Sequence, residues 1–326
     1  MIISRTPLRI SFAGGGSDFK LFYKNGYGSV VSATINKYVY VIVNKRIDNL
    51  IRVGYSKTEF ISDVNEIEHD IIRESLKFLK IDKALDITYI GDISIGNMGT
   101  GLGSSSALAV GVLNALYAYK NQTVSPEKLA QDACKIEIDI LKRPIGKQDQ
   151  YASAYGGLNF IKFNPDESVS VKSLKIKKEI REKLNSNLLM FNTGLNVQSS
   201  VVLNEQKNRI KNNYELLSGV VKLSQVLEKN LNKQNINDFG QILHRNWLLK
   251  KQFAAKVSNS IIDSYYNLAL EAGASGGKIL GSGGGGYLLF HCNSEKSKKQ
   301  VKRALAGLEE LNFKFAPVGS EIVYSD

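Results

Sequence analysis

The chain has 326 residues, a hydrophobic content of 43% and a net charge of +12. Its length exceeds that of the usual single domain and its composition suits a sizeable core, so one large or two medium globular domains are expected. No apolar run reaches the roughly 18 residues of a membrane-spanning helix, and the first residues lack the apolar core and cleavage site of a signal peptide. We therefore expect a cytoplasmic protein without a membrane partner.

The positive charge has three explanations: binding of nucleic acid, binding of small anionic substrates, or a lysine-rich solvated surface. The lysines spread along amphipathic segments such as 172–183 and do not interleave with aromatic residues in one patch. We therefore expect no nucleic-acid partner.

The cysteines and histidines are scattered and show no metal-binding or redox spacing. They are Cys134, Cys292, His69, His244 and His291. A structural zinc site and a His-based catalytic triad are not expected.

The predicted elements begin with apolar runs that are bounded by turns, which indicate strands. These strands cover 8–14, 29–35, 38–47, 51–55 and, after a predicted helix over 65–80, 84–93. Next come a loop at 96–103, a helix over 104–119, a helix over 127–141, a loop at 146–157 and a strand over 158–163. The second of these helices has a clear start, because Ser125 can cap it and Pro126 suits its first position.

A domain boundary is expected near 180–187, where a charged stretch gives way to the apolar run LLMFNTG. We predict an N-terminal domain of residues 1–185 and a C-terminal domain of residues 186–326. Beyond the boundary, the pattern predicts one strand, about three helices between 197 and 272, the strand YLLFHC, a helix over 294–309 and a closing strand. This mixed order favours the α+β class.

Three glycine-rich stretches are the strongest functional signal. They are FAGGGSD (12–18), GTGLGSSSA (99–107) and GASGGKILGSGGGG (273–286). Glycine lets backbone N–H groups approach a phosphate closely, and the helix predicted to start near Ser104 would direct its positive end at such a group. The pattern predicts a chain wrapped around a small anion.

The middle stretch does not fit the common nucleotide-binding patterns. It lacks the Gly-Lys-Ser/Thr of a P-loop, and no acidic residue ends a following strand where a dinucleotide-binding fold needs one. Its serines can cap the helix at Ser104 and reach a phosphate or Mg²⁺ from Ser105 or Ser106. The simpler alternative is a tight turn that is capped by serine.

PLRISFAGGGSD, GLGSSSA and GASGGKILGSGGGGYLLF together resemble the three motifs of the GHMP kinases, a family named after galactokinase, homoserine kinase, mevalonate kinase and phosphomevalonate kinase. The segments IGKQDQYASAYGGLNF and LHRNWLLKK resemble its sugar-1-kinase branch, which includes kinases of D-glycero-D-manno-heptose 7-phosphate and of L-fucose. The resemblance implies an α+β fold of two domains, the N-terminal one ribosomal protein S5 domain 2-like and the C-terminal one ferredoxin-like.

The resemblance also implies a role for each matching residue. The triphosphate of ATP would lie on Gly99, Thr100, Gly101, Leu102, Gly103, Ser104, Ser105 and Ser106, with Mg²⁺ held by Ser105 and Glu137. Asp149 matches the catalytic aspartate, and Arg9 matches the basic residue near the reacting hydroxyl. Substrate contacts are expected from Gly15, Gly16, Ser17 and Asp18 of the first motif and from Gly283 and Gly284 of the third.

Phosphoryl transfer needs alignment, charge neutralisation and an acceptor for the hydroxyl proton. Asp149, in its predicted loop, can take or orient that proton, and Arg9 or Lys147 nearby would keep its carboxylate ionised. Simpler roles stay open: Asp149 as a turn cap, Arg9 as a solvated strand residue, Asp18 as a helix cap and Glu137 on an exposed helix face.

The basic residues beside this loop suggest a second phosphate site. We hypothesise that Arg143 or Lys147 grips a phosphate on the sugar, with arginine favoured for a bidentate contact. The alternative is a charged helix end that interacts with the helix dipole.

The resemblance implies an ATP-dependent kinase that phosphorylates the anomeric (C1) hydroxyl of D-glycero-D-manno-heptose 7-phosphate. The product would be the 1,7-bisphosphate, for nucleotide-activated heptose and surface polysaccharide. The alternative enzyme is an L-fucose or other hexose 1-kinase, and the alternative of another class is a non-catalytic sensor of ATP and sugar. The expected partners are small molecules, and the sequence leaves open whether the chain is a monomer or a homodimer.

Overall fold

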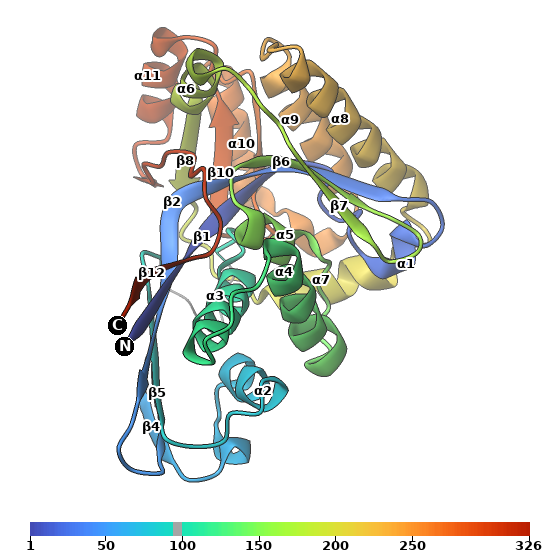
Figure 1. Cartoon of the computed structure of the whole chain (residues 1–326). Helices are drawn as coiled ribbons and strands as arrows, with labels where there is room; N and C mark the ends of the chain where they lie inside the picture. Colours follow the sequence, from blue (N-terminus) through green and yellow to red (C-terminus); the bar gives the residue numbers. More distant parts are fainter. Residues whose placement is uncertain (94–99) are drawn as a thin grey trace.

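The computed structural model describes residues 1–93 and 100–326. Within them, two β-sheets are covered by helices, which confirms the α+β class (Figure 1). The long strands β1 (Ile2–Ala13) and β2 (Gly28–Lys45) run side by side as an antiparallel pair. They form the spine against which helices of both halves of the chain pack.

The larger sheet has eight described strands: six follow the order β12-β1-β2-β5-β3-β4, β6 also pairs with β2, and β7 pairs with β6. Its remaining strands are β3 (Ile51–Gly54), β4 (Thr58–Ile61), β5 (Leu85–Gly91), β6 (Leu158–Phe163), β7 (Val169–Ser173) and β12 (Glu321–Ser325). Residues 28–33 of β2 pair with β6, and residues 39–45 pair with β5. The strands predicted over 29–35 and 38–47 are therefore one continuous strand.

Helix α3 (Ser104–Tyr119) packs on β1 and β2, and it is buried on nearly every side, which explains its apolar sequence. The Ser4 hydroxyl of β1 donates a 2.7 Å hydrogen bond to the carbonyl oxygen of Gly111 in the middle of this helix. The other helical segments of this half are α1 (Lys20–Tyr23), η1 (Val64–Glu66), α2 (Asp70–Phe78), α4 (Pro126–Cys134), η2 (Lys135–Ile140), α5 (Gln148–Tyr155) and α6 (Lys178–Ser186).

The smaller sheet has four described strands, in the antiparallel order β11-β8-β10-β9. Its strands are β8 (Leu188–Asn192), β9 (Gly276–Ile279), β10 (Tyr287–His291) and β11 (Glu309–Glu310). The accompanying helical segments are α7 (Ser199–Asn208), α8 (Tyr214–Asn232), α9 (Phe239–Lys250), η3 (Ala255–Val257), α10 (Ser260–Glu271) and α11 (Glu295–Ala304). Four described α-helices thus occupy 197–272, where about three were predicted.

The loop predicted at 146–157 is wrong over most of its length. Residues 148–155, predicted as loop, form α5, whose Tyr151, Ala152 and Ala154 are buried. The helix predicted over 127–141 is confirmed, with α-helical geometry to Cys134 and π-helical geometry in η2. Short buried helices such as α5 have no solvent-facing polar stripe, so their periodicity is weak in sequence.

The predicted domain boundary at 185/186 falls in the last turn of α6, just before β8, and stays a prediction. The last strand, β12, returns to the larger sheet and pairs with β1, so residues 321–325 lie beside the first strand. Figure 1 accordingly shows the two chain ends next to each other.

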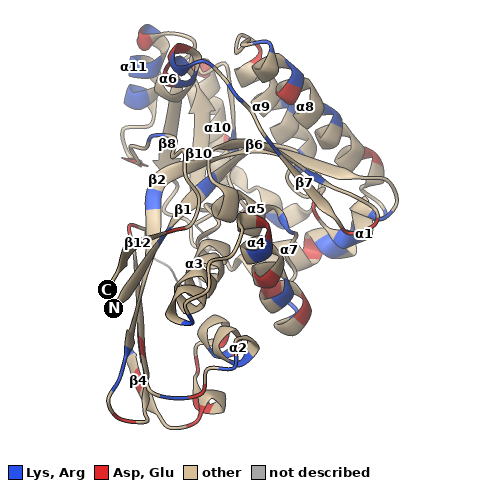
Figure 2. Ribbon diagram, viewed as in Figure 1, with Lys and Arg blue, Asp and Glu red and all other residues tan. Residues whose placement is uncertain are grey.

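The positive charge is distributed over the outside of the molecule. Figure 2 shows Lys and Arg on the outer helices α6, α8 and α11, with acidic residues between them on α6 and α8. This pattern agrees with a lysine-rich solvated surface. No helix among the described residues is both long enough and apolar enough to cross a bilayer.

The close contact between α3 and the sheet yields a first prediction. A Cβ at Gly111 would lie 2.9 Å from Thr6 Oγ1 and 3.3 Å from Val41 Cγ2. Gly111→Leu should therefore push α3 off the sheet and lower the free energy of unfolding by about 1–3 kcal/mol. Urea denaturation measures this loss. Gly307→Leu is the matched control, because a Cβ there meets nothing within 4 Å, and equal losses in the two variants would contradict the packing argument.

A second prediction concerns pH. Burial lowers the pKa of His291 on β10 to about 4, so the folded chain keeps this imidazole neutral where the unfolded chain, with its ordinary value near 6.5, takes up a proton. The free energy of unfolding therefore does not depend on this group above pH 6.5. It falls by about 3 kcal/mol as the pH drops from 6.5 to 4, because the unfolded chain then takes up a proton that the folded chain does not.

Urea denaturation across pH 4–7 measures this dependence. His291→Gln, which can still pair with the neighbouring Ser275 and Asn187, should remove that part of the pH dependence. An unchanged pH slope in the variant would show that His291 does not contribute.

Candidate active site

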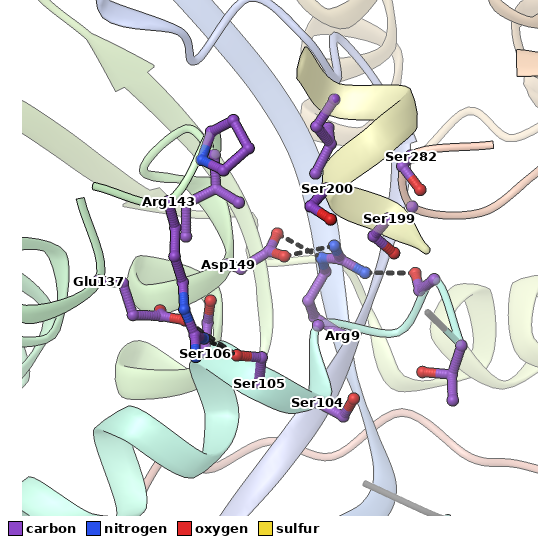
Figure 3. Close-up of a pocket in the computed structure, with 17 residues that line it drawn as sticks. Arg9, Ser104, Ser105, Ser106, Glu137, Arg143, Asp149, Ser199, Ser200 and Ser282 are labelled. Carbon is purple, nitrogen blue, oxygen red and sulfur yellow. Dashed lines mark hydrogen bonds and ion pairs between the residues drawn. The ribbon is translucent and has the colours of Figure 1, made fainter. Parts of the chain in front are cut away.

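A cavity of about 330 Å³ lies where the second and third glycine-rich stretches meet β1, α5 and α7. It is called the nucleotide-side cavity below, and Figure 3 shows its lining side chains. Its lining residues are Arg9, Thr100, Gly101, Gly103, Ser104, Ser105, Ser106, Glu137, Arg143, Pro144, Ile145, Asp149, Ser199, Ser200, Leu203, Gly281 and Ser282. The structure therefore brings residues from four predicted motifs to one place.

Two glycines let these stretches touch. Gly101 and Gly281 have φ angles of +78° and +66°, and a Cβ on Gly281 would lie 2.3 Å from the Cα of Gly101. Any side chain at either position would separate the two backbones. The contact closes the wall of the nucleotide-side cavity.

The start of α3 faces this cavity. Gly103, with a φ angle of +74°, is the N-cap residue, and no side chain caps the helix, so the prediction that Ser104 is the cap is wrong. Ser104 is instead the first helical residue. The N–H groups of a first helical turn have no intrahelical partner and, together with the helix dipole, attract an anion. The hydroxyl-bearing residues 104–106 add polar groups to that end.

Arg9 and Asp149 form a buried ion pair at the centre of the site (Figure 3). Arg9 donates from Nε to Asp149 Oδ1 at 2.7 Å and from Nη2 to Oδ2 at 2.6 Å, which is a bidentate arrangement. Its Nη1 donates to the carbonyl oxygen of Gly101 at 2.6 Å. The Arg9 side chain is 4% exposed, so it is no solvated strand residue, whereas Asp149, in the first turn of α5, is 24% exposed.

A second polar cluster lies beside the start of α3. Glu137, on the π-helical turn η2, is fully buried, so it does not lie on an exposed helix face. Its Oε1 accepts hydrogen bonds from Ser105 Oγ and Arg143 Nη1, both at 3.0 Å. Its Oε2 accepts from Gln150 at 2.7 Å. Burial raises the pKa of Glu137, and the Arg143 charge opposes this rise.

Arg143 ties this cluster to α2. Its Nη2 donates to both carboxylate oxygens of Asp70, at 2.9 and 2.8 Å, and its Nη1 donates to Ser105 Oγ at 2.5 Å. Burial would raise the pKa of Asp70, but the charge and hydrogen bonds of Arg143 outweigh it and lower the pKa. Arg143 is also one of the residues that line the nucleotide-side cavity.

The residues predicted to hold Mg²⁺ have suitable chemistry. Ser105 Oγ and Glu137 Oε1 are 3.0 Å apart and are both oxygen donors, which Mg²⁺ prefers. No group of three or more His, Cys, Asp or Glu residues that could hold a metal occurs within 1–93 and 100–326. The pair would therefore hold the ion only together with oxygens from a bound phosphate chain.

A second hollow adjoins the first across the Arg9–Asp149 pair. It is called the acceptor cavity below, and it shares Arg9, Ile145, Asp149, Leu203, Gly281 and Ser282 with the nucleotide-side cavity. Its own lining residues are Gly16, Asp18, Phe19, Gly146, Gln148, Gln206 and Lys250. Asp149 is thus accessible from both sides.

Asp18 is held firmly in the acceptor cavity. Its Oδ1 accepts a 3.2 Å hydrogen bond from the backbone N–H of Gly16, and its Oδ2 accepts one of the same length from that of Gln148. Burial, and then the neighbouring Asp149 charge, raises the pKa of Asp18. The residue does not cap α1, whose N-cap is Phe19.

Other predicted site residues lie outside both cavities. The Lys147 ammonium donates to the carbonyl oxygen of Glu167 at 2.9 Å and lies over the Tyr23 ring. Ser17 is buried, and its hydroxyl donates to the carbonyl oxygen of Gly14 at 2.8 Å.

The remaining predicted residues are glycines of the first and third motifs and two residues of the middle glycine-rich stretch (99–107), which is called the phosphate loop below. Gly283 and Gly284 pack against the backbone of residues 256–257, and Gly15 lies near Gln148. Leu102 is buried, and its carbonyl oxygen accepts from the backbone N–H of Arg9. Gly99 lies outside the described residues.

Several lining residues were not predicted. Asp70, Ser199, Ser200, Gln206 and Lys250 reach the two cavities or their partners from helices that lie far apart in sequence. Only Ser199 and Ser200 carried a local signal, because they are consecutive hydroxyls at the start of α7, just after Gly194, like the serines at the start of α3.

Two protein-family models match the chain. The model for the GHMP kinases N terminal domain matches residues 64–157, and the model for the GHMP kinases C terminal matches residues 227–309. Together they cover more than half of the chain and include the start of α3, Glu137, Asp149 and the third glycine-rich stretch. The chain belongs to the GHMP kinases. It is therefore a phosphotransferase with an alcohol group as acceptor, and its fold is the GHMP kinase fold.

Individual relatives of this GHMP kinase match it over nearly all of its length. A D-glycero-α-D-manno-heptose 7-phosphate kinase of Campylobacter jejuni is 29% identical, over 92% of each chain. A crystal structure described as a D-glycero-D-manno-heptose 1-phosphate kinase from Bacteroides thetaiotaomicron superposes with a TM-score of 0.82 at 26% identity, over 100% of each chain. Lactococcus lactis galactokinase complexed with galactose superposes with a TM-score of 0.75 over 98% of this chain and 94% of its own. At 19% identity, that likeness shows the fold alone.

The central ion pair of this GHMP kinase yields a third prediction. A double-mutant cycle of Arg9→Met and Asp149→Asn, measured by urea denaturation, should give a coupling energy of at least about 1.5 kcal/mol, because the pair is largely buried and bidentate. The matched control is the cycle of Arg5→Met and Glu321→Gln.

Arg5 of the control pair also lies on β1, but the side chains of Arg5 and Glu321 are 37% and 35% exposed. It should therefore couple by less than about 1 kcal/mol. Equal coupling in the two cycles would show that burial does not strengthen the Arg9–Asp149 pair.

Proposed function

We propose that this GHMP kinase is a sugar 1-kinase that transfers the γ-phosphoryl group of ATP to the anomeric (C1) hydroxyl of D-glycero-D-manno-heptose 7-phosphate. The observation that carries the proposal is the position of Asp149 between two adjoining cavities, paired with Arg9. The names of the two full-length relatives support a phosphorylated heptose as substrate and differ in the position of its phosphate.

The proposed chemistry follows from the arrangement of charges. ATP would place its phosphates at the start of α3 in the nucleotide-side cavity, and the sugar would occupy the acceptor cavity. The anomeric oxygen forms the new bond to the γ-phosphorus as the bond to the β,γ-bridging oxygen of ATP breaks, which releases ADP. The hydroxyl proton passes to the Asp149 carboxylate, because Asp149 is the acidic residue that lines both cavities among the described residues.

Arg9 has two tasks in this scheme. Its bidentate bonds fix the orientation of the Asp149 carboxylate, and its buried positive charge stabilises the negative charge that the transferred phosphoryl group carries. Because the Gly101 carbonyl oxygen takes the third guanidinium bond, Arg9 has a single defined position.

Ser105 and Glu137 would hold Mg²⁺ together with the nucleotide phosphates. The ion would neutralise phosphate charge and orient the phosphate chain. Glu137 stays in place through its hydrogen bond from Gln150 of α5, which links the ion site to the helix that carries Asp149.

The proposed reaction would be one step in a longer reaction sequence. The product, a sugar 1,7-bisphosphate, would next lose its 7-phosphate and receive a nucleotide at C1, as needed for nucleotide-activated heptose and surface polysaccharide. An L-fucose or other hexose 1-kinase is the second candidate. A bifunctional fucokinase/GDP-fucose pyrophosphorylase, matched over 31% of its own length, and a galactokinase are also similar over most of this chain, at 23% identity each.

A fourth prediction tests the activity. With Mg²⁺ and ATP, ADP release should occur with D-glycero-D-manno-heptose 7-phosphate and not with mannose, L-fucose, galactose or mevalonate. Asp149→Asn should lower kcat by about 100- to 10,000-fold, because it removes the proton acceptor and keeps the shape. Asp82→Asn, at an exposed aspartate away from both cavities, is the matched control and should keep full activity.

Each other outcome has its own meaning. Turnover of an unphosphorylated sugar would keep the mechanism and overturn the substrate. ATP binding without turnover of any sugar would favour the non-catalytic sensor. Full activity of Asp149→Asn would overturn its proposed role.

A further inference from the structure

A buried lysine lies in the acceptor cavity. Lys250 is the last residue of α9, is 4% exposed, and lines the same hollow as Asp18, Gln148 and Gln206. Neither the segment LHRNWLLKK nor the relatives' names assign it a role. A buried ammonium group is costly unless hydrogen-bond partners satisfy its donors, so its presence calls for an explanation.

The protein supplies acceptors for only part of the hydrogen-bonding capacity of the Lys250 ammonium. Among the residues that the structure describes, the Lys250 ammonium donates to one acceptor, the carbonyl oxygen of Gly281, and forms no ion pair with Asp18 or Asp149. An ammonium has three donors. Two N–H bonds of Lys250 therefore stay available to a molecule in the cavity.

Another buried lysine shows what a purely structural role looks like. Lys278 of β9 is 1% exposed and donates to two carbonyl oxygens of β1, those of Ser11 at 2.7 Å and Phe12 at 3.3 Å. It is not among the lining residues of either cavity. The Lys278 ammonium therefore links β9 to β1, whereas Lys250 lines the acceptor cavity.

Gln148, which lines the same cavity, is also incompletely bonded. Gln148 donates from Nε2 to Asp18 at 3.3 Å, but its buried Oε1 has no hydrogen-bond partner within the described chain. The acceptor cavity thus offers an unpaired acceptor from Gln148, unpaired donors from Lys250 and the Asp18 carboxylate. A molecule with several hydroxyl groups, which both donate and accept, matches this set.

We propose that Lys250 is an acceptor-binding residue, whose ammonium donates hydrogen bonds to one or two oxygens of the bound sugar on the side of Asp149 away from the nucleotide. The inference rests on the proposed function, because it places the sugar in the acceptor cavity. It adds a charged hydrogen-bond donor from α9 to a hollow that is also lined by Asp18 of the first motif and by Gln148.

The charge state of Lys250 agrees with this role. Burial, and then the charge of Arg9, lowers its pKa to about 8, while the charges of Asp18 and Asp149 oppose the fall. The group therefore stays mostly protonated at pH 7 and donates charge-assisted hydrogen bonds, which are stronger than neutral ones.

A fifth prediction tests Lys250 by calorimetry at pH 7. The chain is saturated with Mg²⁺ and the non-hydrolysable analogue AMPPNP and titrated with D-glycero-D-manno-heptose 7-phosphate, with the same heptose lacking the phosphate, and with mannose, L-fucose and galactose. Lys250→Met should weaken binding of the sugars about 10- to 100-fold, which corresponds to one charge-assisted hydrogen bond. Binding of AMPPNP should change less than twofold.

Two lysine variants serve as controls. Lys251→Met removes a neighbouring lysine that is 31% exposed and pairs with Asp263, and it should leave sugar binding unchanged. Lys278→Met should lower the free energy of unfolding but keep the affinity for sugar. A loss confined to the phosphorylated heptose would assign the bond to its phosphate, and an equal loss for both heptoses would assign it to a hydroxyl.

The outcomes separate this inference from the proposed function. Sugar binding that depends on Lys250, without ADP release, would uphold Lys250 and overturn the kinase assignment. ADP release by the wild-type chain, together with unchanged sugar affinity in Lys250→Met, would uphold the kinase assignment and overturn the inference. The role of Lys250 would then be limited to its hydrogen bond with the Gly281 carbonyl oxygen. An equal loss of AMPPNP and sugar affinity would show general damage and overturn the inference, and a wild-type chain that binds no sugar would overturn both.

Discussion

One guanidinium group holds the centre of this structure together. Arg9 leaves the buried strand β1 and bonds at the same time to the phosphate loop, through Gly101, and to the first turn of α5, through Asp149. Because Arg9 is almost fully buried, its charge is tolerable only while these partners stay in place. The bonds that satisfy Arg9 therefore also set Asp149 at the border between two cavities, so stability and catalytic geometry have the same origin.

The glycine-rich stretches share a composition but differ in their tasks. The middle stretch leaves the first N–H groups of α3 open toward a cavity, which suits a phosphate. The third stretch mainly lets backbones approach one another, because Cβ atoms at Gly281, Gly283 and Gly284 would meet neighbouring backbone atoms within 3 Å. Glycine content alone therefore does not locate an anion site; the start of a following helix is needed as well.

The sequence predicted the parts of the site that are local in the chain. The start of α3 follows from Gly103 and the serines after it, and the resemblance to the GHMP kinases singled out Arg9, Glu137 and Asp149, which line one cavity. It did not predict α5, whose buried faces weaken the periodic signal, or Lys250 and Asp70, whose meaning comes from contacts across the fold. Lys147 shows the converse, because its position in the chain suggested the site while its side chain bonds elsewhere.

The contact between Gly101 and Gly281 has a mechanical consequence. Two backbones with no side chain between them leave no soft layer that can compress, so the spacing of the second and third glycine-rich stretches is fixed at this point. The nucleotide-side cavity therefore has one wall of fixed shape, and Arg9 is attached to that wall through its hydrogen bond to the Gly101 carbonyl oxygen.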